Sequence, residues 1–242
     1  MKVFALSDPH LALSAPYRAG EPPQVYKPMD IFGPQWQDYY GTLYANWLQT
    51  VGPEDTVLMA GDISWAMTLP ETLYDFDYLA ALPGQIVIVK GNHDYWWQSI
   101  SQVRSALPPN CRALQHSSLI VGSRAVCGSR GWLTPDHPDY SEAEDGKIYA
   151  RELLRLRMAL EEGAQSGLPL VALTHYPPLS QPTAHNDMLA LLKEFSVELC
   201  VYGHIHGSLA KNVAAGPCQG LEFVNASCDR LNFLPLLLWE EP

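Results

Sequence analysis

Short apolar runs recur along the chain, and most are continuous rather than alternating with polar residues. Such continuous runs are typical of strands in a sheet that is covered on both faces. We expect buried strands over residues 3–7, 56–60, 86–89, 170–174 and 199–202.

Longer segments between these runs have apolar residues at helical spacing. They predict helices over residues 36–51, 69–82, 95–107 and 141–165. Ser141 and Glu144 have the spacing of a capping box at the start of the last helix. Strands that alternate with helices are typical of parallel βαβ units and predict an α/β protein.

Three further segments depart from this alternation. Residues 118–121 and 125–127 flank Gly122-Ser123 and predict a hairpin in a second sheet. Residues 209–239 contain short strand-like runs that Gly216-Pro217 interrupts. Residues 11–34 lack periodicity and predict a long loop, which is either a lid over a functional site or a static ordered segment.

Length and composition indicate one folded unit. The chain has 242 residues, 47% apolar and 17% charged, enough apolar material for a core and too little charge for a disordered chain. Internal repeats and linker-like segments are absent from the sequence. We expect a single domain over residues 1–242.

Net charge and cysteine content restrict the partners and the compartment. With 15 Lys and Arg against 26 Asp and Glu, the formal charge is −11, which disfavours nucleic acid or an anionic membrane as partner. Asp8 interrupts the first apolar stretch, and the run over residues 233–239 is too short to span a membrane. The five cysteines are odd in number and form no C-x-x-C pair. These features favour a cytoplasmic protein.

Five predicted strands end in residues of the same chemical kind. The segments are Asp8-Pro9-His10, Gly61-Asp62, Gly91-Asn92-His93-Asp94, Thr174-His175 and Gly203-His204-Ile205-His206. Because loops at the carboxyl ends of strands converge on one crevice, these side chains are expected to meet there.

Seven of these residues are natural metal ligands. They are Asp8, His10, Asp62, Asn92, His175, His204 and His206. Imidazole, carboxylate and amide ligands without thiolate suit divalent Mn, Fe, Zn, Co or Ni. Seven ligands are too many for one catalytic ion, so we expect two ions, and Asp62 is placed to bridge them. Such a pair activates water and stabilises a phosphoryl group under attack.

His93 lies beside the expected ligand Asn92 and is free to act on a leaving group as a general acid. Asp94 is expected to orient the His93 imidazole. A structural role for His93 is the alternative.

The ordered set of segments resembles the calcineurin-like metallophosphoesterase family, with its D-x-H, G-D, G-N-H-[DE], single H and G-H-x-H pattern. All five blocks are intact between Asp8 and His206. The resemblance implies a four-layer α/β/β/α sandwich and hydrolysis of phosphate esters by a metal-bridging hydroxide. It also implies that Asp8, His10 and His206 serve one ion and that Asn92, His175 and His204 serve the other.

The sequence departs from the protein phosphatases of this superfamily. Where they resemble G-D-x-V-D-R-G and R-G-N-H-E, this chain has Gly61-Asp62-Ile63-Ser64-Trp65 and Lys90-Gly91-Asn92. The chain more closely resembles the smaller bacterial phosphohydrolases, and a small phosphorylated molecule is the expected substrate. A phosphodiesterase, cyclic nucleotide, pyrophosphatase or nuclease activity at the same site is the first alternative. A non-catalytic binding module on the same fold is the second.

Residues beside the motifs are candidates for substrate contacts. Trp65, Trp96 and Trp97 either line an apolar pocket or pack in the core. Arg130 lies between glycines and either holds phosphate or forms a salt bridge at the rim. Arg151, Arg155 and Arg157 are expected on a solvated helix face, paired with Glu152 and Glu161.

Overall fold

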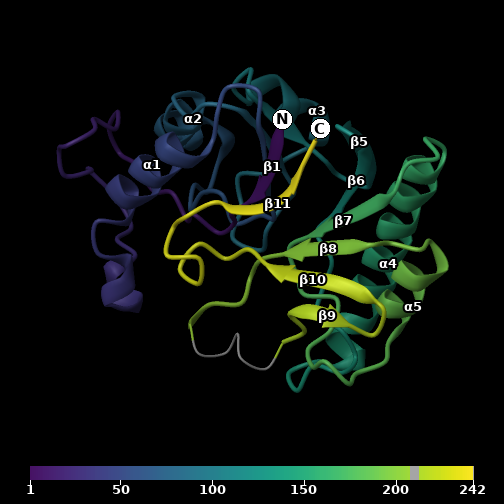
Figure 1. Cartoon of the computed structure of the whole chain (residues 1–242). Helices are drawn as coiled ribbons and strands as arrows, with labels where there is room; N and C mark the ends of the chain where they lie inside the picture. The colour runs from purple at the N-terminus through teal and green to yellow at the C-terminus, as the bar shows by residue number, and fades with distance from the viewer. Residues whose placement is uncertain (208–212, 242) are drawn as a thin grey trace.

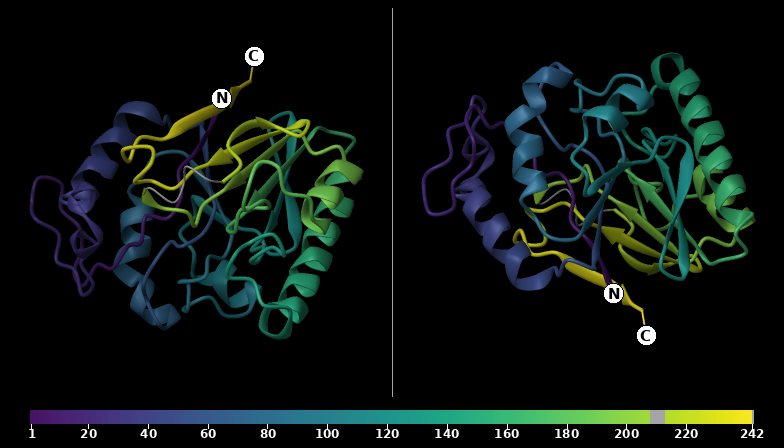
Figure 2. Two further views of the ribbon diagram at one scale, coloured as in Figure 1. Left: turned by 90° about the horizontal axis from the view of Figure 1, so that it is seen from below. Right: turned by 90° about the horizontal axis from the view of Figure 1, so that it is seen from above.

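Two sheets pack face to face, and helices cover the outer face of each (Figure 1). The computed structural model describes residues 1–207 and 213–241. In both views of Figure 2, the blue helices of the N-terminal half and the long green helix lie on opposite sides of the strands. The layers therefore run α/β/β/α, and the predicted sandwich is confirmed.

The first sheet has the order β11-β1-β2-β3-β4. Its strands are β1 (Lys2–Ala5), β2 (Thr56–Met59), β3 (Gln85–Ile88), β4 (Cys111–Ala113) and β11 (Leu236–Glu240). Strands β1 to β4 are parallel, with Phe4 paired to Val57, and β11 is antiparallel to β1. Because β11 pairs with β1, the two chain ends lie close together.

The second sheet has the order β5-β6-β7-β8-β10-β9. Its strands are β5 (Ser117–Val121), β6 (Arg124–Ser129), β7 (Leu170–Thr174), β8 (Leu199–Tyr202), β9 (Gly216–Cys218) and β10 (Leu221–Asn225). Strands β6, β7, β8 and β10 are parallel, and β5 with β6 forms the predicted hairpin. Gly216-Pro217, predicted as a break, lies inside β9, where an edge position tolerates proline. Of the run predicted from 209, residues 209–212 lie outside the described residues.

The helices divide between the two outer faces. They are α1 (Tyr39–Thr50), α2 (Leu73–Ala80), α3 (Ile100–Ala106), α4 (Glu142–Ala164) and α5 (Asp187–Glu194), with short 3₁₀ helices η1 (Asp30–Phe32), η2 (Pro34–Trp36) and η3 (Leu69–Thr72). Residues of α1, α2 and α3 share an apolar cluster with the first sheet, and those of α4 and α5 share one with the second.

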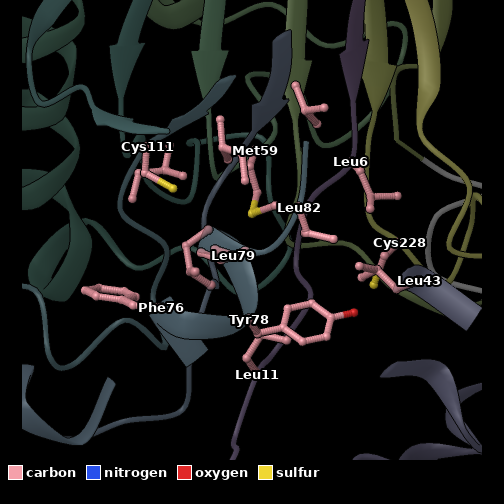
Figure 3. Packing of buried hydrophobic residues seen from close by; sticks show 14 of the residues in the cluster. Leu6, Leu11, Leu43, Met59, Phe76, Tyr78, Leu79, Leu82, Cys111 and Cys228 are labelled. Carbon is pink, nitrogen blue, oxygen red and sulfur yellow. The ribbon is translucent and has the colours of Figure 1, made fainter. Parts of the chain in front are cut away.

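Each central strand is apolar on both faces because it contributes to two layers of core. On β2, Val57 and Met59 face the helices, whereas Leu58 packs between the sheets. Figure 3 shows part of the helix-side cluster, where Met59 lies near Leu79 and Leu82. The continuous apolar runs of the sequence follow from this double burial.

Two predicted helices begin later than their spacing indicated. The first starts at Tyr39 rather than at residue 36, after the 3₁₀ turn η2. The segment predicted from residue 95 is helical only over α3. Its first residues instead form a turn, in which the Trp97 N–H donates to the Asp94 carbonyl at 3.2 Å. The tryptophans of this turn are buried although they precede the helix. The apolar spacing at the start of the predicted segment therefore comes from a buried turn and not from a helix.

The long helix α4 has the expected extent but a different cap. Ser141 occupies the N-cap position without a side-chain capping bond. Instead, its backbone N–H donates to Asp145 Oδ2 at 2.9 Å, and Trp132 Nε1 donates to the other oxygen at 2.8 Å. The predicted capping box is therefore wrong, because Asp145 takes over the role expected of Glu144.

The expected charge pairing on α4 is also partly wrong. Glu152 is buried rather than solvated, with its side chain 1% exposed. Arg157 pairs with Glu194 of α5 at 2.6 Å instead of with Glu161. Proximity between α4 and α5 determines this pairing, which sequence spacing along one helix does not reveal.

Three features bear on the remaining sequence predictions. Residues 11–13 are buried and anchor the start of the long loop, and Leu11 bridges to Ser64. All five cysteines are free thiols, and four of them are buried. Within the described residues, no helix combines the length and apolar character that crossing a membrane requires.

Candidate metal centre

The seven predicted ligands gather at the carboxyl ends of the strands. Asp8 and His10 follow β1, Asp62 follows β2, Asn92 follows β3, His175 follows β7, and His204 and His206 follow β8. A backbone bridge between Ser7 and Ser227 joins the strand ends of the two sheets. Side chains that follow strands of both sheets therefore meet in the crevice.

One group of donor atoms contains Asp8, His10 and His206, whose ligating atoms lie within 4.8 Å of one another. The Nε2 atoms of His10 and His206 are 3.3 Å apart. Asp62 Oδ2 lies 3.7 Å from His10 Nε2 and completes the group.

A second group contains Asn92, His175 and His204. Asn92 Oδ1 lies 2.6 Å from His175 Nε2 and 2.8 Å from His204 Nδ1. Asp62 Oδ2 is 3.6 Å from His175 Nε2. The same oxygen of Asp62 thus lies between both groups, the position that a bridging carboxylate requires.

Hydrogen bonds outside the two groups select the ring nitrogen that His175 and His206 present. His175 Nδ1 donates to the Ala60 carbonyl at 2.8 Å, and His206 Nδ1 donates to Asp229 Oδ1 at 2.8 Å. Each bond leaves the lone pair of Nε2 free to bind a metal ion, and carboxylate or carbonyl partners of this kind are typical around bound metals.

The backbone at this site adopts rare conformations. Asp8, His10, Asp62 and His204 have φ values of 56°, 46°, 52° and 71°. Left-handed backbone is uncommon outside glycine and costs about 1–3 kcal/mol per residue. Four strained residues among seven candidate ligands indicate that the fold holds these side chains in place at the expense of local stability.

Gly91 allows the Asn92 loop to approach Asp62. A Cβ atom at Gly91 would lie 2.1 Å from both Asp62 N and Asp62 Oδ1. The approach lets the His93 backbone N–H donate to Asp62 Oδ1 at 2.8 Å, which directs the other oxygen toward the histidines.

The charges of the crevice suit divalent cations. Burial raises the pKa of Asp8 to about 6, and burial together with Asp94 and Asp8 raises the pKa of Asp62 well above its ordinary value. The ion pairs of both carboxylates are with histidines.

Most of these histidines carry no charge near neutral pH. Burial holds the pKa of His10 and His175 well below the ordinary value and lowers that of His204 to about 3. Burial also lowers the pKa of His206, but the hydrogen bond to Asp229 and the charge of Asp8 outweigh it and raise the value. Buried carboxylates among neutral imidazoles fit divalent cations, so the donor set suits the two ions expected.

Asp229 was not predicted from the sequence. It lies 23 residues after His206, in the turn that follows β10, and also accepts from the Gly207 N–H at 2.9 Å. The signal that could have found it is its place after an apolar strand, the same signal that located the other residues.

Replacing Asp229 by asparagine is expected to weaken metal binding by about 10–100-fold, since His206 loses the charge that fixes its tautomer and raises its basicity. Competition with a chromogenic chelator measures the affinity. Asp77→Asn, an exposed change on α2, serves as the control. Equal affinities for Asp229→Asn and the parent chain would show that the hydrogen bond does not tune the site.

His93 lies at a cavity of about 370 Å³ beside the first group of donors. His10, His206, Trp65, Trp36 and Met29 also line it. Burial and the charge of Lys27 lower the pKa of His93. Its Nδ1 is buried without a hydrogen-bond partner among the described residues.

Asp94 does not orient His93, contrary to the sequence prediction. The buried Asp94 carboxylate accepts from the backbone N–H groups of Ile63, Ser64 and Gly91 and from Trp96 Nε1, at 2.7–3.1 Å. It therefore ties the Asp62 loop to the Asn92 loop and acts as a structural support for both.

The three tryptophans that are candidates for substrate contacts differ in their exposure and in their neighbours. Trp65 is 9% exposed. The centroid of its ring lies 4.9 Å from that of His10, on which it stacks, and 4.2 Å from that of His93. Lys27 Nζ lies 3.0 Å from the same centroid. Trp96 is fully buried, so it cannot contact a substrate, and that expectation is wrong. Trp97 is 6% exposed and donates to Gln115.

Arg130 lies near the second group of donors but outside the cavity of His93. Its backbone carbonyl accepts from the N–H of His175 at 3.0 Å, while its guanidinium lies 3.6 Å from Glu152 and 4.5 Å from the centroid of the Trp132 ring. The salt bridge is thus present, and Glu152 is buried.

Comparisons with known proteins agree with this site. Residues 1–208 match the family model described as calcineurin-like phosphoesterase. No curated protein matches the chain.

Among solved structures, a protein of unknown function from Aquifex aeolicus is similar, with a TM-score of 0.51 at 15% identity over 98% of this chain and 95% of that one. The phosphopantetheinyl hydrolase of Mycobacterium tuberculosis has a TM-score of 0.58 at 15% identity over 100% of this chain and 96% of that one. At this identity the likeness concerns the fold.

Proposed function

The chain belongs to the calcineurin-like phosphoesterase family, and from this premise we propose that it hydrolyses the phosphate ester of a small molecule with two divalent transition-metal ions. The observation that carries the proposal is the position of Asp62 Oδ2, 3.7 Å from His10 Nε2 and 3.6 Å from His175 Nε2. Residues 1–242 would act as one domain.

The residues of the chain divide the work. Asp8, His10 and His206 would hold one ion, Asn92, His175 and His204 the other, and Asp62 both. Two such ions, when bound, lower the pKa of water and neutralise charge on a phosphoryl group. Manganese, iron, zinc, cobalt and nickel all suit these ligands.

His93 would donate a proton to the leaving group. Its ring lines the cavity, and an anionic substrate there favours the protonated imidazole by attraction. Trp65 would hold the ring in place through its contacts with both His93 and His10.

A small substrate agrees with the cavity and the charge. About 370 Å³ lies at the low end of the range for small-molecule sites. The formal charge of −11 disfavours nucleic acid as partner. The five free thiols suit a reducing compartment such as the cytoplasm.

The chain loaded with manganese is expected to hydrolyse p-nitrophenyl phosphate faster than bis(p-nitrophenyl) phosphate, and to lose this activity in EDTA. Product absorbance measures both rates, and added metal should restore them. Faster hydrolysis of the bis ester would assign a phosphodiesterase instead. Metal-loaded chain that is inactive on both esters would favour a binding module.

A further inference from the structure

A second cavity, of about 240 Å³, has a concentration of positive charge that the proposed mechanism does not use. Lys90, Arg130, Arg151 and Arg155 line it together with one carboxylate, Glu152. The formal charge of these five residues is 4 − 1 = +3, in a chain whose total is −11.

Glu152 forms ion pairs with the three arginines. One of its oxygens, Oε1, lies 2.6 Å from Arg155, 3.6 Å from Arg130 and 3.6 Å from Arg151. The side chain of Glu152 is 1% exposed, whereas that of Arg151 is 53% exposed. The three guanidinium groups thus converge on one buried carboxylate, while each arginine side chain stays partly exposed.

Lys90 has no such direct contact, although the charges of Asp94 and Glu152 attract it. It makes no hydrogen bond or ion pair with any residue in the described part of the chain, although it is half-buried. Glu152 supplies one negative charge against the four positive charges that line the cavity, so an anion that enters it gains net attraction.

The cavity adjoins the second group of metal ligands. Lys90 precedes Asn92 by two residues, so their Cα atoms are at most about 7 Å apart. Arg130 accepts a backbone bond from His175 at 3.0 Å. Two residues that line the cavity are therefore connected through the backbone to ligands of the second group.

We propose that this cavity binds a phosphate-type anion through Lys90, Arg130, Arg151 and Arg155. Planar guanidinium groups match the oxygens of phosphate in pairs, and the ammonium adds a point charge. The volume, smaller than that of typical organic ligand sites, suits a compact anion. The anion is either a second charged group of the substrate, a source that rests on the proposed function, or a separate inorganic phosphate.

Titration calorimetry with inorganic pyrophosphate tests the site on the full chain in EDTA, where the metal centre does not contribute. We expect Lys90→Met and Arg151→Met each to weaken binding at least about tenfold. Lys147→Met, which removes an exposed charge from the same helix as Arg151, should leave binding unchanged. Equal binding by the parent chain and Lys90→Met, or absence of binding by the parent chain, would overturn the site.

Melting temperature separates binding from folding. Because Lys90 forms no hydrogen bond or ion pair among the described residues, Lys90→Met should melt at or above the temperature of the parent chain in phosphate-free buffer. Added pyrophosphate should raise the melting temperature of the parent chain and not that of the variant. A variant that melts lower without pyrophosphate would assign Lys90 a structural role.

Kinetics of the manganese-loaded chain distinguishes the two sources. An alkanediol bisphosphate is compared with the alkyl monophosphate of equal length. A substrate group in the cavity predicts a kcat/KM ratio of about ten or more that Lys90→Met abolishes through KM. A separate anion predicts loss of pyrophosphate binding with an unchanged ratio. Inactivity on every ester would contradict the proposed function and leave the calorimetric result standing.

Discussion

Asp62→Asn is expected to reduce phosphoesterase activity by at least about 10³-fold, equivalent to about 4 kcal/mol of transition-state stabilisation. One oxygen of Asp62 faces histidines from both groups of donors. An amide has the same shape but lacks the charge that two neighbouring cations require. Rates with p-nitrophenyl phosphate and metal content by mass spectrometry measure the effect, and fewer than two ions per chain should remain.

The stability of the metal-free chain shows whether Asp62→Asn acts on folding. Burial of the Asp62 carboxylate, followed by repulsion from Asp94 and Asp8, raises its pKa. Removing this charge should keep or raise the melting temperature without metal, while activity falls. Asp139→Asn, an exposed change, is the control for both measurements. Full activity of Asp62→Asn with two bound ions would exclude the bridging role.

The strand-end residues of the site could be predicted because the signal is local. Each apolar run is buried on both faces, and the polar residue that follows must lie at the rim of the sheet. The same rule therefore predicts that Asp8 and Asn92 lie in one crevice, although they are 84 positions apart. The hairpin of β5 and β6 was predicted for the same reason, since Gly122-Ser123 is a local turn signal.

Partners that are set by packing between distant segments could not be predicted. Asp229 reaches His206 because β10 lies beside β8, a pairing that neither strand's own sequence specifies. Trp96 belongs to a segment whose apolar spacing predicts a helix. It lies instead in a turn, where its Nε1 donates to the buried Asp94. Strand β4 has three residues with an exposed centre, too short and too polar for an apolar pattern.

His93→Ala is expected to slow hydrolysis of alkyl phosphates by about 10²–10⁴-fold and of p-nitrophenyl phosphate much less. An alkoxide leaving group needs a proton in the transition state, whereas nitrophenolate leaves without one. The dependence of kcat on leaving-group pKa measures this, and its slope should steepen in the variant. His185→Ala, an exposed histidine outside the motifs, should retain the slope of the parent chain.

The alanine variant separates the His93 side chain from its backbone. The His93 N–H that donates to Asp62 Oδ1 at 2.8 Å is retained in His93→Ala, so Asp62 keeps its orientation and two ions should still bind. Slowing by the same factor for good and poor leaving groups would show that the imidazole does not supply the proton. Because Trp65 packs against both His93 and His10, loss of one ion in the variant would instead assign His93 to support of the first group of donors.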